Sequence, residues 1–66
     1  MNTLRQMREQ KELTLLDVAL KLGYKYPSSY AKIEKGEQQL KSDQIMLLAD
    51  LFCVSKEKIL QTSYSM

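Results

Sequence analysis

Apolar residues recur three or four positions apart along most of this chain, which is the spacing that places them on one face of an α-helix. Leu4 and Met7 share such a face near the start, and Ile45, Leu48 and Phe52 share another further along. No stretch shows the alternation of Val, Thr and Tyr with polar residues that is typical of β-strands. The pattern therefore predicts an all-α fold.

Residues that start and stop helices divide this pattern into segments. Thr3 is expected to cap a first helix that runs to about Lys11. Thr14 is expected to cap a second helix, with Asp17 at the third position completing an acidic variant of the capping box, and Gly23 ends it.

The second half of the chain carries three more such segments. Pro27 fits the first turn of a third helix, and Gly36 gives its end signal. A fourth helix is predicted from Ser42-Asp43 to about Phe52, and Ser55 is expected to cap a short fifth helix through residue 60. The prediction is a compact five-helix domain over residues 1–61, followed by a frayed tail over residues 62–66.

The inward faces of these helices define an expected core. Its members are Leu4, Met7, Val18, Ala19, Leu22, Tyr30, Ile33, Ile45, Leu48, Ala49 and Phe52. Cys53 follows the fourth helix and is expected to be a buried or half-buried structural thiol, with a redox switch as the minor alternative.

Composition excludes several classes of function. The 66 residues include no histidine, one cysteine and two glycines, so we expect no enzyme activity, no metal site, no cofactor, no disulfide within the chain and no glycine-rich phosphate loop. The longest apolar run is residues 45–49, far short of the roughly 18 residues that span a bilayer, and no secretory signal is evident. We expect a soluble cytoplasmic protein without a membrane contact.

Charge is concentrated in the middle of the chain. Residues 21–41 hold five lysines against two glutamates, a net charge of +3, whereas residues 42–66 hold two lysines against three acids, a net charge of −1. This distribution fits either a solvated surface or a face that binds a polyanion such as nucleic acid.

The spacing around the second and third helices is typical of a helix-turn-helix. Ala19 is small enough to let the next helix approach, Gly23 makes a sharp turn, and the following helix is rich in short polar residues that fit a major groove. With these features and an ordered set of further segments, the chain resembles the lambda-repressor/Cro-like family, also called the xenobiotic-response-element type. The segments are Leu4-Arg5-Gln6-Met7-Arg8-Glu9, Leu13-Thr14, Val18-Ala19, Leu22-Gly23, Tyr30-Ala31-Lys32-Ile33-Glu34-Lys35-Gly36, Leu48-Ala49, Val54-Ser55 and Ile59-Leu60.

The resemblance implies a double-stranded DNA operator as partner and the third helix as the element that reads it. The positions it indicates for base contacts are Tyr26, Ser28, Ser29 and Lys32. The positions it indicates for phosphate contacts are Thr14, Lys25, Lys35 and Lys41. It also matches Arg8 and Glu34 to a charged pair that holds the reading helix at a fixed angle, although solvated surface charge is the alternative for each of these residues.

The chain departs from the family pattern at several places, among them Cys53, which stands where Gly usually ends the fourth helix. Relatives commonly carry Gln after the Thr that starts the second helix, and here that position is Leu15, which either touches a thymine methyl or loses the DNA contact. The turn after Gly23 is one residue longer than usual, so base contacts are uncertain by one position around Pro27.

Two leucine pairs lie off the expected core stripes. Their members are Leu16 with Leu20, and Leu47 with Leu51. They either widen the core or form a contact with a second copy or another protein, such as an antirepressor. The resulting hypothesis is a sequence-specific repressor of phage, mobile-element or antitoxin type, located on the bacterial nucleoid when bound. The alternative is a protein-interaction module of the same fold that has lost specific DNA binding.

Overall fold

Five helices follow one another in the computed structural model, which describes residues 3–61. Their bounds are α1 (Leu4–Gln10), α2 (Leu15–Lys21), α3 (Pro27–Glu34), α4 (Ser42–Phe52) and α5 (Lys56–Leu60). No β-strand occurs within this described range, so the all-α prediction is confirmed. The tail predicted over residues 62–66 lies outside the described residues.

Three of the predicted helix starts, those of α1, α2 and α5, are confirmed by their hydrogen bonds. The Thr3 hydroxyl accepts from the Gln6 N–H at 3.1 Å, and the Gln6 side chain accepts from the Thr3 N–H at 3.0 Å. Thr14 and Asp17 make the same reciprocal pair at 3.0 and 2.8 Å. The Ser55 hydroxyl accepts from the backbone N–H three residues later at 3.3 Å. Each start is thus fixed by a local sequence signal.

The residues that end α2, α3 and α4 have positive φ angles, and at the end of α4 one prediction is wrong. Gly23 and Gly36 adopt φ angles of 92° and 81°, which glycine reaches without steric cost. Cys53 takes the equivalent place after α4 with φ 57° and ψ 44°. The prediction that its thiol is buried or half-buried is wrong, because Cys53 is exposed. The chain leaves the helix axis at this residue, and its side chain therefore lies beyond the buried face of α4.

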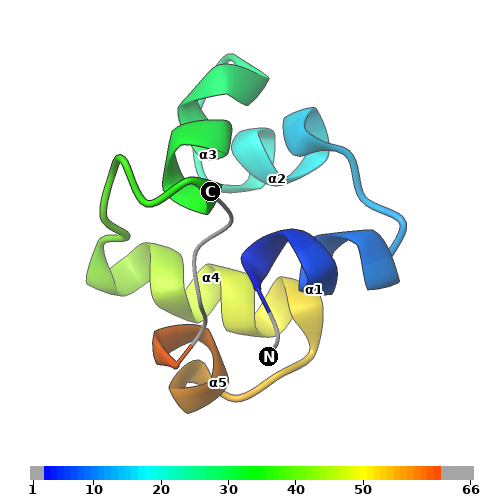
Figure 1. Cartoon of the computed structure of the whole chain (residues 1–66), viewed down its shortest axis with the longest axis vertical. Helices are drawn as coiled ribbons and strands as arrows, with labels where there is room; N and C mark the ends of the chain where they lie inside the picture. Colours follow the sequence, from blue (N-terminus) through cyan, green and yellow to red (C-terminus); the bar gives the residue numbers. More distant parts are fainter. Residues whose placement is uncertain (1–2, 62–66) are drawn as a thin grey trace.

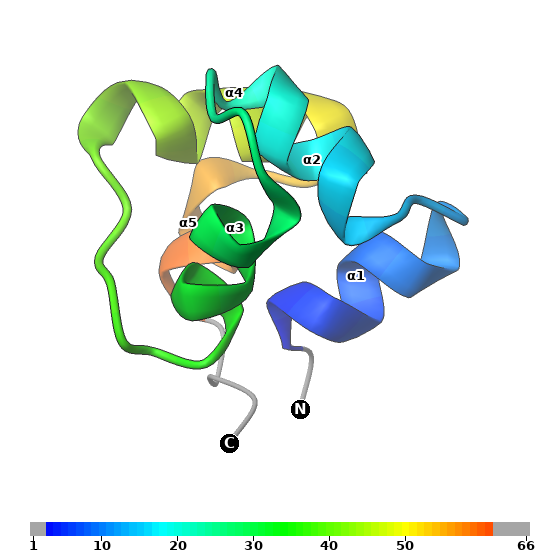
Figure 2. The ribbon, with the colours of Figure 1, turned by 90° about the horizontal axis from the view of Figure 1, so that it is seen from above.

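All five helices contribute to one core. Figures 1 and 2 show α2 lying against α3, and α5 lying against α4. The buried apolar residues are Leu4, Met7, Val18, Ala19, Leu22, Tyr30, Ile33, Leu48, Phe52 and Ile59. Ile45 and Ala49, expected in the core, are half-buried against it. Within the described residues, no helix is long and apolar enough to cross a bilayer.

Candidate nucleic-acid interface

Helix α3 has one buried face and one exposed face. Tyr30 and Ile33 are fully buried on the inner face. Ser28 and Lys32 are exposed and lie four residues apart, so they share the outer face, and Ser29 beside them is half-buried. The outer face therefore offers a hydroxyl and an ammonium group that approach a ligand without displacing any core residue.

The start of α3 carries a large exposed aromatic side chain. Tyr26 precedes the helix in an extended conformation and is 67% exposed. Its side chain makes no capping hydrogen bond, and Pro27 occupies the first helical position. Lys25 is also exposed. This turn thus places Tyr26 next to the outer face of α3 with its ring free for contact.

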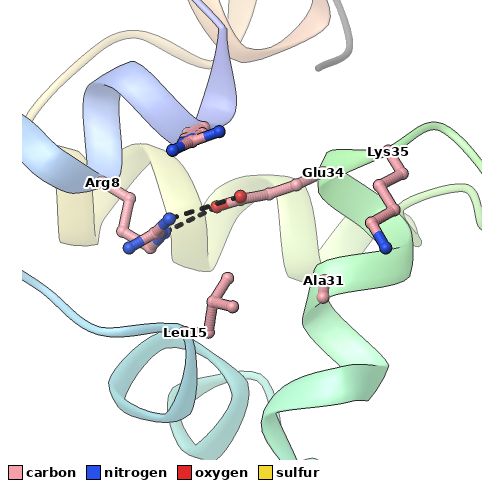
Figure 3. A pocket seen from close by; sticks show the side chains of 6 residues that line it. Arg8, Leu15, Ala31, Glu34 and Lys35 are labelled. Atoms are coloured by element: carbon pink, nitrogen blue, oxygen red, sulfur yellow. Dashed lines mark hydrogen bonds and ion pairs between the residues drawn. The ribbon is translucent and has the colours of Figure 1, made fainter. Parts of the chain in front are cut away.

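Arg8 and Glu34 form a buried ion pair that joins α1 to α3. Arg8 Nε lies 2.7 Å from Glu34 Oε2, and the two side chains are only 11% and 7% exposed (Figure 3). Arg8 also donates to the Leu13 carbonyl at 2.9 Å. The hydrogen bond to Glu34 raises the pKa of the Arg8 guanidinium above its ordinary value. One arginine therefore fixes the end of α3 against both α1 and the connection to α2.

Tyr30 lies next to this ion pair on the buried face of α3. Its ring is fully buried, and its hydroxyl makes no hydrogen bond of standard geometry within the described residues. Burial, and secondly the charge of the Glu34 carboxylate, raise the pKa of this phenol. Tyr30 is therefore a neutral core residue, and its hydroxyl does not reach the outer face of the helix.

A cleft of about 230 Å³ opens beside the ion pair, between α1, the start of α2 and the end of α3. Its lining residues are Arg5, Arg8, Leu15, Ala31, Glu34 and Lys35. Figure 3 shows Leu15 reaching from α2 toward the ion pair, with Lys35 across the cleft on α3. Leu15 is half-buried and packs against the core. Its side chain thus contributes to packing at the start of α2.

The lysines around α3 are free of carboxylate partners. Within residues 3–61, the ion pairs are Arg5–Glu9 and Arg8–Glu34, so none of the lysines between 21 and 41 is neutralised. Lys35 ends α3, and Lys41 precedes α4; both are exposed. Thr14 is exposed at the start of α2. Positive charge therefore flanks the outer face of α3 on both sides in sequence.

The structure adds a polar cluster that sequence reasoning missed. The Tyr24 hydroxyl accepts hydrogen bonds from Gln38 Nε2 at 3.0 Å and from Gln44 Nε2 at 2.9 Å. Gln44 is only 5% exposed, and its Oε1 accepts from the Lys41 N–H at 3.0 Å. A signal was present, because Gln44 lies four residues before Leu48 on the apolar stripe of α4. A buried amide at such a place requires polar partners.

The four leucines of the two pairs divide between a protein-contact surface and a wider core. Leu16, Leu20 and Leu47 are exposed by 42%, 57% and 43%. Leu51 is half-buried and packs against the core. Leu47 and Leu51 line a groove together with Lys21 and Asp50, which carry opposite charges. Three leucines thus remain accessible to a partner, and one widens the core.

The described residues contain no cluster of three or more His, Cys, Asp or Glu side chains that could hold a metal ion. Comparison with protein-family models gives a match to a helix-turn-helix family over residues 4–59. No curated protein and no solved structure gives a significant match. The matched range covers every helix described above except the last residue of α5.

Proposed function

Because the chain belongs to the lambda-repressor/Cro-like helix-turn-helix family of DNA-binding regulators, we propose that it represses transcription by occupying a double-stranded DNA operator. The observation that carries the proposal is the exposed outer face of α3, flanked by lysines that have no carboxylate partner within residues 3–61. A helix presented in this way fits the major groove. Bound protein would block polymerase without any chemical step.

The base contacts in this proposal come from α3 and the residue before it. The Ser28 and Ser29 hydroxyls donate or accept at base edges, and Lys32 reaches guanine acceptors or a phosphate. The exposed ring of Tyr26 supplies apolar contact next to them. Serine pairs with several bases, so sequence discrimination rests mainly on Lys32 and on the angle of the helix.

The phosphate contacts come from the segments on either side. Thr14 stands at the start of α2, Lys25 in the turn, and Lys35 and Lys41 around the connection from α3 to α4. Each phosphate neutralised by a lysine releases counterions, so affinity falls as salt rises. These contacts fix the register of α3 on the duplex but carry no sequence information themselves.

Alanine variants test the base contacts. Lys32→Ala is expected to weaken binding to a duplex selected from random sequence by about tenfold, which corresponds to one good base contact. Lys56→Ala removes another exposed lysine, at the start of α5, and is the control. Fluorescence anisotropy at constant salt measures both. Equal losses for the two variants would show that only diffuse charge is sensed and would contradict the proposed reading by α3.

We also propose that the protein binds its operator as a homodimer through the groove that contains Leu47 and Leu51. Lys21 and Asp50 line this groove with opposite charges, so a two-fold axis through the groove would allow Lys21 of one copy to pair with Asp50 of the other. The described domain measures 26 × 24 × 24 Å, which suits the roughly 34 Å between reading helices one DNA turn apart.

Sedimentation equilibrium tests the dimer. Leu47→Ser should shift the protein toward monomer, whereas Met46→Ser, a change at a neighbouring residue that is 65% exposed, should not. If the wild-type protein is a monomer at every concentration, with and without DNA, the dimer proposal is wrong. The exposed leucines would then favour contact with a different protein, such as an antirepressor, or the interaction module that has lost DNA binding.

A further inference from the structure

The start of α3 is not held by a cap of its own. Tyr26 makes no side-chain capping bond, in contrast to Thr3, Thr14 and Ser55 at the starts of α1, α2 and α5. The first backbone bond after it, from the Ser29 N–H to the Tyr26 carbonyl, is 3.3 Å, the same length as the bonds from Val18 to Thr14 and from Ile59 to Ser55. The turn before α3 is therefore the one whose N-cap side chain gives no hydrogen bond, in contrast to those before α1, α2 and α5.

Tyr24, two residues earlier, is held at both of its ends. Its backbone N–H donates to the Ala19 carbonyl of α2 at 2.9 Å. Its hydroxyl accepts from Gln44 on α4 and from Gln38 in the connection between α3 and α4. The side chain thus bridges the turn before α3 and the connection after it.

Gln44 gives this bridge a rigid base. Both ends of its amide are occupied, because Nε2 donates to Tyr24 and Oε1 accepts from the Lys41 backbone. The side chain is buried, so water does not compete for these bonds. The cluster therefore links Tyr24, next to Lys25, to the backbone of Lys41. These two lysines are the proposed phosphate contacts before and after α3.

We propose that Tyr24, Gln38 and Gln44 form a positioning clamp that sets the angle of α3 in the major groove. The clamp holds the turn and the connection at a fixed separation, so the phosphate contacts of Lys25 and Lys41 and the base contacts of α3 are made together. Tyr24 is a positioning residue and does not itself touch DNA. This inference rests on the proposed function and identifies residues that set the sequence specificity of DNA binding.

The test is the ratio of affinities for a selected duplex and for an unrelated duplex of the same length. Tyr24→Phe removes the shared acceptor and keeps the ring, and Gln38→Ala removes one donor at a half-buried loop position. Ser55→Ala is the control, because it removes a hydrogen bond at the start of α5, far along the chain from α3. Circular dichroism identifies a temperature at which every variant is folded.

The clamp predicts that Tyr24→Phe and Gln38→Ala lower the affinity for the selected duplex about fivefold or more and leave binding to the unrelated duplex unchanged. Tyr24→Phe in a Gln38→Ala background should cost less than it does alone, since the two groups share a bond. Ser55→Ala should leave the ratio intact.

Two results distinguish a failure of the proposed function from a failure of the clamp. If wild-type protein shows no preference for any duplex, the proposed function fails and the clamp falls with it. If wild-type protein shows a preference, but Tyr24→Phe and Gln38→Ala leave the ratio of the two affinities unchanged or lower it no more than Ser55→Ala does, the clamp alone is overturned. Gln38→Ala keeps the test decisive should Tyr24→Phe not fold, because it leaves the Gln44 bond in place.

Discussion

Two arginines of α1, each paired with a glutamate, show how burial changes the energetic contribution of the same ion pair. Arg5 and Glu9 are 58% and 53% exposed and 3.3 Å apart, and water screens their attraction. Arg8 and Glu34 are 2.7 Å apart and almost fully buried, and they join segments far apart in the sequence. Loss of one partner leaves the other charge largely buried and without its counterion.

Glu34→Ala is accordingly expected to lower the free energy of unfolding by about 3 kcal/mol. Small domains have only about 5–15 kcal/mol in total, so this loss is a large fraction of the stability of the protein. Glu9→Ala removes the exposed partner of Arg5 and should cost less than about 1 kcal/mol. Urea denaturation measures both. Similar losses would contradict the role assigned to the buried pair.

At the scale of the element, helix starts can be predicted from local sequence, whereas the burial of single residues depends on tertiary contacts. The capping residues Thr3, Thr14 and Ser55 could be predicted because a cap depends only on residues three positions apart. The exposure of Cys53 and the hydrogen-bond partner of the Gln44 amide on Tyr24 could not, because both depend on where α4 meets the rest of the chain. The same holds for Tyr24, whose partners lie 14 and 20 residues away.

Cys53 provides a prediction about the end of α4. A residue with a side chain pays roughly 1–2 kcal/mol in the left-handed conformation, and glycine does not, although glycine loses more backbone entropy on folding. Cys53→Gly should therefore stabilise the protein by about 0.5–1 kcal/mol. Cys53→Ala keeps the steric cost and should give no gain. A thermal melt in which alanine stabilises as much as glycine would rule out backbone strain as the cause.

At the scale of the whole molecule, the fold follows from the order of its segments. The five helices, most of the core and the family could be predicted from the apolar spacing and from the motifs around α2 and α3. The positions proposed to touch DNA rest on the resemblance, and the structure adds where their side chains stand. Leu15 illustrates the gap: its apolar character is visible in the sequence, but its place in the cleft beside Arg8 depends on three helices.

Charge and shape together support DNA as the partner. The five lysines between residues 21 and 41 lie before, within and after α3 in the sequence. The Arg8–Glu34 pair joins the end of α3 to α1, and the Tyr24 cluster joins the turn before α3 to the connection after it. Binding should thus combine a salt-dependent contribution from phosphates with a sequence-dependent contribution from α3.

The central claim is tested most directly by selecting bound sequences from a pool of random duplex DNA at two salt concentrations. We expect one enriched site with two-fold symmetry, its half-sites about one helical turn apart, weakened but still preferred at the higher salt. Weak binding that enriches no sequence and vanishes with salt would contradict sequence-specific regulation by this protein.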